Sequence, residues 1–139
     1  MKPAFRLIPV LLFLSAMPCL AQKVVIIANR STRLETISTS DLRDIFLGGL
    51  TRFSNGTVAV PVLQRSGPEH DQFLKDYVGK VDSSFRSGWR SLVFTGQASM
   101  PKVEDGDAAM LSFVASTPGA IGYINKSSTH ENVIILTVK

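Results

Sequence analysis

Residues 58–78 read VAVPVLQRSGPEHDQFLKDYV, and this stretch decides the fold because it joins a strand, a tight turn and a helix. The apolar run Val58–Leu63 predicts a buried strand. Ser66-Gly67 is a turn signal, and Pro68 suits the first turn of a helix that we expect to reach residue 78. A strand that ends in a turn and continues as a helix is a unit from which layered α/β domains are built.

Two details of this stretch predict how it packs. Pro61 has no N–H to donate to a neighbouring strand, which places its strand at a sheet edge or at a bulge. In the helix, the spacing of Phe73, Leu74 and Tyr77 directs their side chains inward. The helix therefore has one apolar face with which to cover the sheet.

The rest of the chain adds further strands and helices on both sides of this stretch. Apolar runs predict strands over Val24–Ala28, Ala120–Ile124 and Val133–Val138, and the polar segment 29–39 is expected to be a loop. Helices are expected to begin at Asp41, at Asp82 or Ser83, and at Asp107. Their expected apolar faces are Leu42, Ile45 and Phe46; Phe85, Trp89, Leu92 and Val93; and Leu111 and Val114. This order predicts an α/β fold, a single three-layer lobe with a mixed sheet.

Composition fits one globular domain and excludes several classes of protein. The chain has 139 residues, of which 45% are hydrophobic and 19% charged. Its two His and one Cys are too few for a zinc finger, an iron–sulfur cluster or a disulfide scaffold. No apolar run reaches the roughly 18–20 residues that a membrane-spanning helix needs.

Residues 1–21 have the pattern of a secretory signal peptide. Lys2 and Arg6 supply the positive start, and an apolar run follows over residues 7–17. Small residues at Cys19 and Ala21 suit a cut after Ala21. We therefore predict export of a domain spanning residues 22–139 to the periplasm.

Cleavage changes the properties of the expected mature chain. It removes two of the 15 basic residues, so the formal charge becomes 13 − 11 = +2, and it removes the only cysteine. A charge of +2 spread along the chain argues against binding to nucleic acid. Lipid attachment at Cys19 is the alternative, although Met17 and Pro18 fit a lipoprotein signal badly.

The turn after the predicted strand is the candidate binding site. Arg65 stands where the strand ends, and ligands of open α/β sheets favour the carboxyl ends of strands. Its guanidinium, the Ser66 hydroxyl and the free N–H groups at the helix start suit phosphate, sulfate or a carboxylate. The predicted anion-binding residues are Arg65, Ser66, Gly67 and His70. The alternative is a turn that only caps the helix, with Arg65 paired to Glu69 or Asp71.

No residue is predicted to be catalytic or to bind a metal, and no cofactor is expected. Ser66, His70 and Asp71 are the residue types of a hydrolase triad. However, His70 and Asp71 are adjacent on a helix and point in different directions, so Asp71 cannot orient His70. The two histidines, His70 and His130, lack the spacing of a metal-binding motif.

Three stretches identify a resemblance to a known family. Residues 39–53 read TSDLRDIFLGGLTRF, the strand that begins at Val58 ends in Arg65-Ser66, and residues 113–124 read FVASTPGAIGYI. In order and approximate spacing they resemble the DL..IFLGKITNW, RSDGSGT and V..TPGAIGYV segments of the phosphate-binding proteins of bacterial ABC importers. The resemblance spans residues 41–124, and it implies the type II periplasmic binding fold and a non-enzymatic role in phosphate binding.

The chain also departs from this family. Family members are usually more than twice as long and close two lobes around phosphate, so this chain resembles one lobe. In the family, the Arg, Asp, Ser and Thr of RSDGSGT contact phosphate, and Arg65 and Ser66 match the first two letters. Gly67 stands where the Asp should be, and residues 68–70 replace Gly-Ser-Gly. Glu69 would repel any anion that it faced.

The resemblance and the departures lead to two hypotheses. The first is an exported domain that binds phosphate or another small oxyanion, related to the substrate-binding proteins of ABC transporters. One lobe with few hydrogen bonds reaches only millimolar affinity, so tight binding needs a second chain, for example in a homodimer. The alternative is an accessory or sensory module that has lost its ligand and docks on an envelope or membrane protein. Gly67 and Glu69 favour this alternative.

Overall fold

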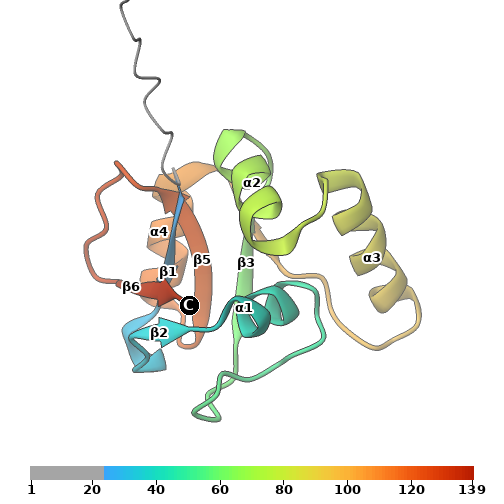
Figure 1. The fold of residues 1–139 in the computed structure, drawn as a ribbon, viewed down its shortest axis with the longest axis horizontal. Helices are drawn as coiled ribbons and strands as arrows, with labels where there is room; N and C mark the ends of the chain where they lie inside the picture. The colour runs from blue at the N-terminus through green and yellow to red at the C-terminus, as the bar shows by residue number, and fades with distance from the viewer. Residues whose placement is uncertain (1–23) are drawn as a thin grey trace, which may run out of the picture.

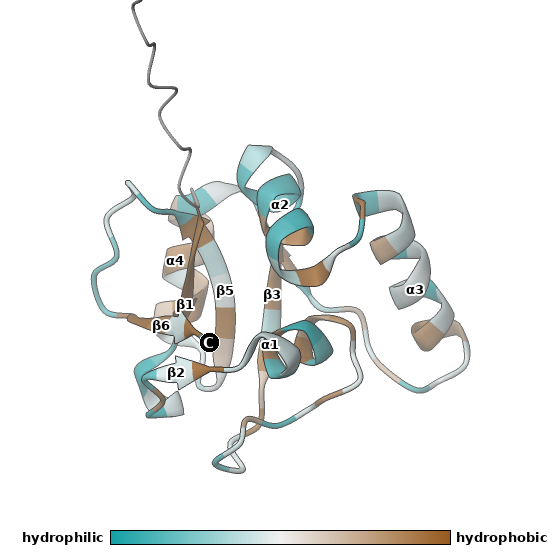
Figure 2. Cartoon of the chain, viewed as in Figure 1, coloured by the Kyte–Doolittle hydropathy of each residue, from teal (hydrophilic) through white to brown (hydrophobic). Residues whose placement is uncertain are grey.

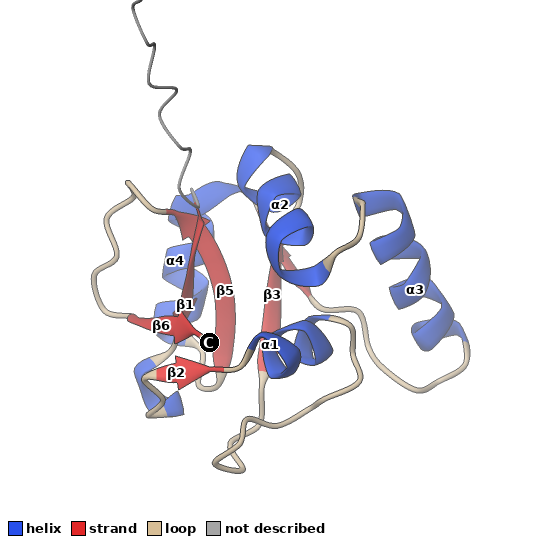
Figure 3. Ribbon diagram, in the orientation of Figure 1, coloured by secondary structure: helices blue, strands red, loops and turns tan. Residues whose placement is uncertain are grey.

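The computed structural model describes residues 24–139, which form a six-stranded mixed sheet with helices on both faces (Figures 1 and 3). The strands are β1 (Val24–Ala28), β2 (Thr36–Ile37), β3 (Val60–Gln64), β4 (Lys102–Glu104), β5 (Ala120–Asn125) and β6 (Ile134–Val138). Their order across the sheet is β2-β6-β1-β5-β3-β4. β1 runs antiparallel to β5 and β6, whereas β3 runs parallel to β5 and β4. The predicted mixed sheet is therefore confirmed.

The helical segments are η1 (Arg30–Thr32), α1 (Thr39–Phe46), α2 (Pro68–Phe73), η2 (Leu74–Val78), α3 (Asp82–Phe94) and α4 (Gly106–Ser116). Alternation along β5 shows which face each helix covers, because successive strand residues point to opposite faces. Gly122 approaches Met110 and Val114 of α4. The next residue, Tyr123, stacks on Phe73 of α2. The sheet thus lies between α4 on one face and α1 with α2–η2 on the other, which is the predicted three-layer arrangement (Figure 1).

Two short strands are missing from the sequence prediction. β2 lies inside the segment expected to be a loop, and β4 follows Pro101 with two charged residues among its three. Neither has an apolar run or an alternating pattern long enough to be recognised. Both are strands because they pair with a longer strand, β2 with β6 and β4 with β3.

Pro61 stands in an interior strand and not in an edge strand, which corrects the prediction. β3 has β5 on one side and β4 on the other. However, β4 pairs only from Val62 onward, so at Pro61 the strand has a neighbour on the β5 side alone. The missing N–H therefore interrupts no pairing with β4.

Helices α1 and α2–η2 bury the faces predicted for them. Ser38 caps α1, since its side chain accepts a hydrogen bond from the N–H of Asp41 at 3.0 Å. The predicted apolar face of α1 is buried in the core. The helix that begins at Pro68 continues to Val78 as expected, with its last turn wound as a π-helix. Its inward residues are buried as predicted, namely Phe73, Leu74 and Tyr77.

The other two helices pack with fewer of the expected residues. On α3 only Phe85 and Trp89 are buried, while Val93 is exposed. Trp89 anchors the helix by donating its indole N–H to the carbonyl of Phe46 at 2.8 Å. On α4 the buried residue beside Val114 is Met110 and not Leu111. Figure 2 agrees, since α3 is pale or hydrophilic over much of its length while α4 is apolar.

The carboxyl ends of β3, β4 and β5 lie at one edge of the sheet, because these strands run parallel. Helices α2 and α4 begin just after β3 and β4. This edge is where the predicted binding residues lie. The predicted signal peptide, residues 1–21, falls outside the described residues, and within residues 24–139 no helix is long and apolar enough to span a membrane.

Candidate functional site

The turn between β3 and α2 has the predicted form. Arg65 and Ser66 are exposed at the end of β3. Gly67 has φ +115°, a conformation that other residues adopt only under strain, and it is the residue before the helix begins at Pro68. The N–H of Arg65 donates to the carbonyl of Glu104 at 3.0 Å, which ties the turn to β4.

The Arg65 side chain pairs with Asp105, in the connection between β4 and α4. Its Nε lies 2.7 Å from Oδ1 of Asp105, and the two side chains are 66% and 73% exposed. The helix carboxylates Glu69 and Asp71, which local spacing suggested as partners, make no ion pair with it. An ion pair this exposed contributes only about 0–1 kcal/mol, so it leaves the guanidinium accessible to other groups.

Arg86 of α3 holds the backbone of the same turn. Its Nη2 donates to the carbonyl of Arg65 at 2.6 Å. Its Nε donates to both carboxylate oxygens of Asp82, at 2.8 and 3.0 Å. Asp82 and Arg86 are four residues apart on the helix, so one ion pair on α3 positions the exposed turn.

His70 does not lie with the other predicted anion-binding residues, and this corrects the prediction. Its side chain is only 1% exposed. Its Nδ1 lies 2.5 Å from the hydroxyl of Tyr123, and its Nε2 lies 2.7 Å from Oδ1 of Asp82. The helical position that follows Pro68 and Glu69 turns the ring toward the core. Both ring nitrogens therefore have partners inside the protein.

The hydrogen bonds of this network assign the protons. The Asp82 carboxylate can only accept, so Nε2 of His70 carries a proton and donates it to Oδ1. With its proton on Nε2, the ring accepts at Nδ1 from the Tyr123 hydroxyl, which itself accepts a hydrogen bond from the N–H of Gln64 at 2.8 Å. Burial raises the pKa of the Tyr123 hydroxyl, which keeps it protonated as the donor. The network thus runs from β3 and β5 through α2 to α3.

Asp82 has a pKa below its usual value of 3.8. Burial alone would raise it, but the hydrogen bonds from His70 and Arg86 outweigh that effect by favouring the carboxylate. A lowered pKa in the folded state means that the unfolded chain binds the proton more readily. The stabilisation is therefore present above pH 3.8 and is lost as the pH falls through the lowered pKa.

We predict that Asp82→Asn makes the free energy of unfolding less dependent on pH in the acid range. The variant is less stable at neutral pH, and it loses less additional stability below about pH 4 than the wild type does. Urea unfolding at a series of pH values measures this. Asp44→Asn, at an exposed position on α1, should keep the wild-type slope, and an unchanged slope in Asp82→Asn would contradict the assignment.

The neighbouring start of α4 is already occupied by a carboxylate. Asp107 accepts hydrogen bonds from the side-chain amide of Gln64 at 2.7 Å, the N–H of Asn125 at 3.0 Å and the hydroxyl of Ser128 at 2.6 Å. Glu69 in turn accepts from the Asn125 amide at 3.1 Å. Because these carboxylates repel a further negative charge, an anion is disfavoured at the start of α4. The Arg65–Ser66 turn is therefore the better candidate for an anion site at this edge.

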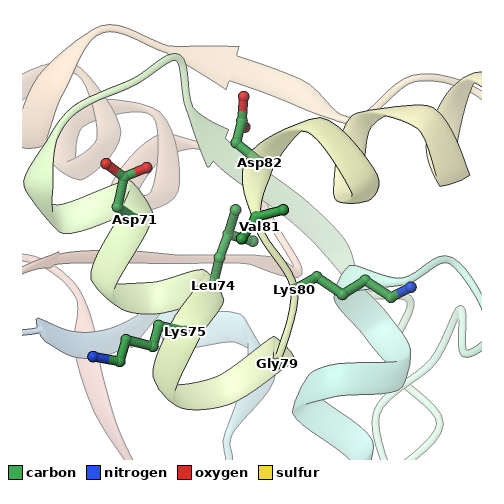
Figure 4. Close-up of a pocket in the computed structure, with 7 residues that line it drawn as sticks. All are labelled: Asp71, Leu74, Lys75, Gly79, Lys80, Val81 and Asp82. Atoms are coloured by element: carbon green, nitrogen blue, oxygen red, sulfur yellow. The ribbon is translucent and has the colours of Figure 1, made fainter.

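A surface depression of about 420 Å³ lies beside this edge, between α2–η2 and the start of α3. Figure 4 shows Leu74 and Val81 at its centre, while Lys75 and Lys80 point away from each other. The carboxylates of Asp71 and Asp82 lie toward one end of it. Because its lysines do not converge, this depression lacks the cation arrangement that an anion site needs.

Sequence reasoning missed the residues that support the turn, namely Asp82, Arg86, Asp105 and Tyr123. The only local signal was the four-residue spacing of Asp82 and Arg86, which is typical of a helix ion pair. Asp105 is 40 residues from Arg65, and Tyr123 is 53 residues from His70. Only the folded sheet brings these side chains together.

Comparison with solved structures supports the fold described above. No family model matches the chain. It is similar to a structure from Clostridium perfringens assigned as a phosphate ABC transporter substrate-binding protein, with bound phosphate: TM-score 0.65, 20% identity, 84% of this chain and 44% of that one. It is also similar to an ABC-type phosphate transport receptor from Vibrio cholerae, with a TM-score of 0.62 and 15% identity; the match covers 84% of this chain and 46% of the receptor. The match to PstS from Borrelia burgdorferi has a TM-score of 0.62 and 16% identity, and it covers 84% of this chain and 47% of that protein.

The solved neighbours are binding proteins, and the chain spans less than half the length of each. The match agrees with the alternation of strands and helices and with the mixed sheet described above. This chain therefore has the fold of the phosphate ABC transporter substrate-binding proteins, over a part of their length that forms a complete layered sheet of its own.

Proposed function

We propose that the protein is an exported domain that binds a small oxyanion, with phosphate as the first candidate, at the Arg65–Ser66 turn. The observation that carries this proposal is the Arg65 guanidinium, which is exposed at the carboxyl end of β3 while its backbone is held by Arg86 and Glu104. The fold supports it, because the solved neighbours are phosphate-binding proteins. His70 is not part of the proposed site.

The remaining groups predict weak binding. Arg65, the Ser66 hydroxyl and the N–H of Gly67 can supply a few charge-assisted hydrogen bonds, each worth roughly 1.5–3 kcal/mol. A millimolar site needs about −4 kcal/mol and a micromolar site about −8 kcal/mol. Asp105 and Glu69 lower the affinity further, since both are negatively charged beside the turn. We therefore propose a millimolar site, which a second chain would have to cover for tight binding.

Export and partners complete the proposal. A signal peptide over residues 1–21 would place the domain in the periplasm, and N-terminal sequencing of the exported protein, expected to begin at Gln22, tests this. The second wall of the site would come from another copy of the chain or from an envelope protein. In either case the exposed edge beside Arg65 is the surface that the second chain would meet.

We expect Arg65→Ala to weaken phosphate binding strongly. Residues 22–139, which include every strand and helix described, are titrated with phosphate while amide chemical shifts are followed by NMR. In the wild type, shifts should concentrate at residues 65–70 and saturate in the millimolar range. Because the main cation of the turn is gone, affinity in the variant should fall by about tenfold or more.

Arg43→Ala is the matched control, since Arg43 is exposed on α1 and belongs to no contact in the turn. It should bind phosphate like the wild type. Equal loss in both variants would mean that only net charge matters. No shift at residues 65–70 up to several tens of millimolar phosphate would overturn the proposed function, and a search for an envelope protein partner would follow.

A further inference from the structure

The far edge of the sheet, opposite the Arg65 turn, presents apolar side chains to solvent. It is the edge where β1 ends and where β3 and β5 begin, since β1 runs antiparallel to β5 and β3 runs parallel to it. Helix α3 begins beside the turn, where Arg86 contacts it, and ends toward the far edge (Figure 1). Val58 before β3, Phe94 at the end of α3 and Met100 before β4 are 51%, 93% and 50% exposed. Three segments thus each project an apolar residue there.

The far edge is also basic. Arg30 and Arg33 directly follow β1, and Arg52 lies in the connection that leads to β3. The two segments lie side by side, because the Asn55 amide donates to the carbonyl of Thr32 at 2.7 Å. All three arginines are exposed. Among the residues that the structure describes, none of the three makes an ion pair, so their charges remain available.

Arg90 extends this basic surface onto α3. It is exposed, belongs to none of the ion pairs of residues 24–139, and lies one helical turn before Phe94, so both side chains project on one side of the helix. Glu35, before β2, is the acidic residue nearest the arginines that follow β1. Most other carboxylates follow β3 and β4 at the opposite edge, namely Glu69, Asp71, Asp82, Glu104, Asp105 and Asp107. The molecule therefore has one basic, apolar edge and one acidic edge.

We infer that the far edge docks on an anionic lipid surface, with Phe94 inserted at the headgroup level and the arginines over the lipid phosphates. Peripheral membrane binding combines buried apolar area with the attraction of basic residues to anionic lipids, and this edge supplies both. The Arg65 turn then points away from the bilayer into the aqueous phase.

The shape of the far edge favours a lipid surface over a protein. Its three projecting side chains expose apolar area on the order of 300 Å², whereas a stable protein interface buries about 800 Å² on each partner. They also stand on separate segments, and a fluid bilayer adapts to each of them without a matching pocket. A second copy is disfavoured, because pairing two far edges would bring unpaired arginines together.

Cosedimentation with vesicles tests the inference on residues 22–139, the chain expected after export. The protein should bind vesicles of phosphatidylglycerol and phosphatidylcholine in equal parts, should be released by added salt, and should not bind pure phosphatidylcholine. Phe94→Ser should weaken binding roughly tenfold, because it removes the largest apolar side chain of the edge. Arg30→Gln should weaken it about fivefold.

Two matched controls lie toward the Arg65 side. Val81→Ser removes an apolar side chain that is 67% exposed beside Asp82, and Lys126→Gln removes an exposed positive charge just after β5. Both should bind vesicles like the wild type. Phosphate binding at the Arg65 turn is a separate property, so Phe94→Ser should leave the phosphate titration unchanged.

Three results would overturn the inference. The first is no binding of the wild type to the anionic vesicles. The second is equal weakening in Lys126→Gln and Arg30→Gln, which would mean that net charge alone attracts the protein. The third is a dimer in sedimentation velocity that Phe94→Ser dissociates while vesicle binding stays unchanged, which would assign the far edge to a second copy. None of these results bears on the oxyanion site, which the phosphate titration tests by itself.

Discussion

Replacing Gly119 with alanine is expected to lower the free energy of unfolding by about 3 kcal/mol or more, one of the largest effects of any single substitution in this chain. Gly119 has φ +77°, and a Cβ added there would overlap the carbonyl oxygen of Val58. The overlapped atom belongs to the backbone, so no side-chain rotation relieves it. Gly119 also accepts a hydrogen bond from the N–H of Val60 at 2.9 Å, and a shift of its backbone would break this bond.

Gly56→Ala is the matched control for this prediction. Gly56 has φ +87°, but a Cβ there would meet no atom within 4 Å. It therefore measures the cost of the backbone conformation alone, about 1–2 kcal/mol. Urea unfolding followed by the fluorescence of Trp89, the single tryptophan, reports both variants. If Gly119→Ala were no less stable than Gly56→Ala, the close approach of residues 58 and 119 would not exist in solution.

Gly119 also illustrates what the sequence could predict. The TPGAIGY segment resembles a family pattern, and its apolar residues predict the strand over Ala120–Ile124. Local signals of this kind predict elements well, because apolar spacing, caps and turn residues act over a few positions. They also placed Arg65 and Ser66 correctly at the end of a strand.

What the sequence could not predict is which side chains meet across the fold. The sequence predicts His70 in the binding turn because it follows the turn closely, yet the helix directs its ring into the core, where it contacts Tyr123 and Asp82. Local spacing offers Glu69 and Asp71 as alternative partners for Arg65, yet the parallel pairing of β3 with β4 brings Asp105 to it instead. Spacing along the chain indicates possible contacts within an element, whereas contacts between elements depend on strand order.

The same dependence explains the two missed strands. β2 and β4 are short segments whose pairing with β6 and β3, and not an apolar pattern of their own, makes them strands. They matter for the site, because β4 delivers Glu104 and Asp105 to the turn. The sequence alone therefore indicates Arg65, the cation of the proposed site, but not Asp105, the carboxylate that lowers its affinity for an anion.

The second large effect is expected for Tyr123→Phe, which should lower the free energy of unfolding by about 2–4 kcal/mol. The variant keeps the ring, which stacks on Phe73 with centroids 4.0 Å apart, and it removes only the hydroxyl. That hydroxyl accepts from the N–H of Gln64 and donates to Nδ1 of His70, both buried. Each buried polar group left without a partner costs about 1–3 kcal/mol, which is why so small a change has a large effect.

A double-mutant cycle with His70→Phe separates this network from ring packing. His70→Phe removes the nitrogen to which the Tyr123 hydroxyl donates. In that background, Tyr123→Phe should therefore lower the free energy of unfolding by at least about 1 kcal/mol less than it does in the wild type. Hydrogen exchange offers an independent measurement, because the amide of Gln64 loses its acceptor in Tyr123→Phe and should exchange faster than that of the neighbouring Leu63. If Tyr123→Phe lowered the free energy of unfolding equally in both backgrounds and left exchange at Gln64 unchanged, the hydroxyl would make neither hydrogen bond. A positive coupling would instead establish that Tyr123 and His70 stabilise the fold together, and the contacts of His70 with Asp82, of Asp82 with Arg86, and of Arg86 with the Arg65 carbonyl extend this pair to the turn.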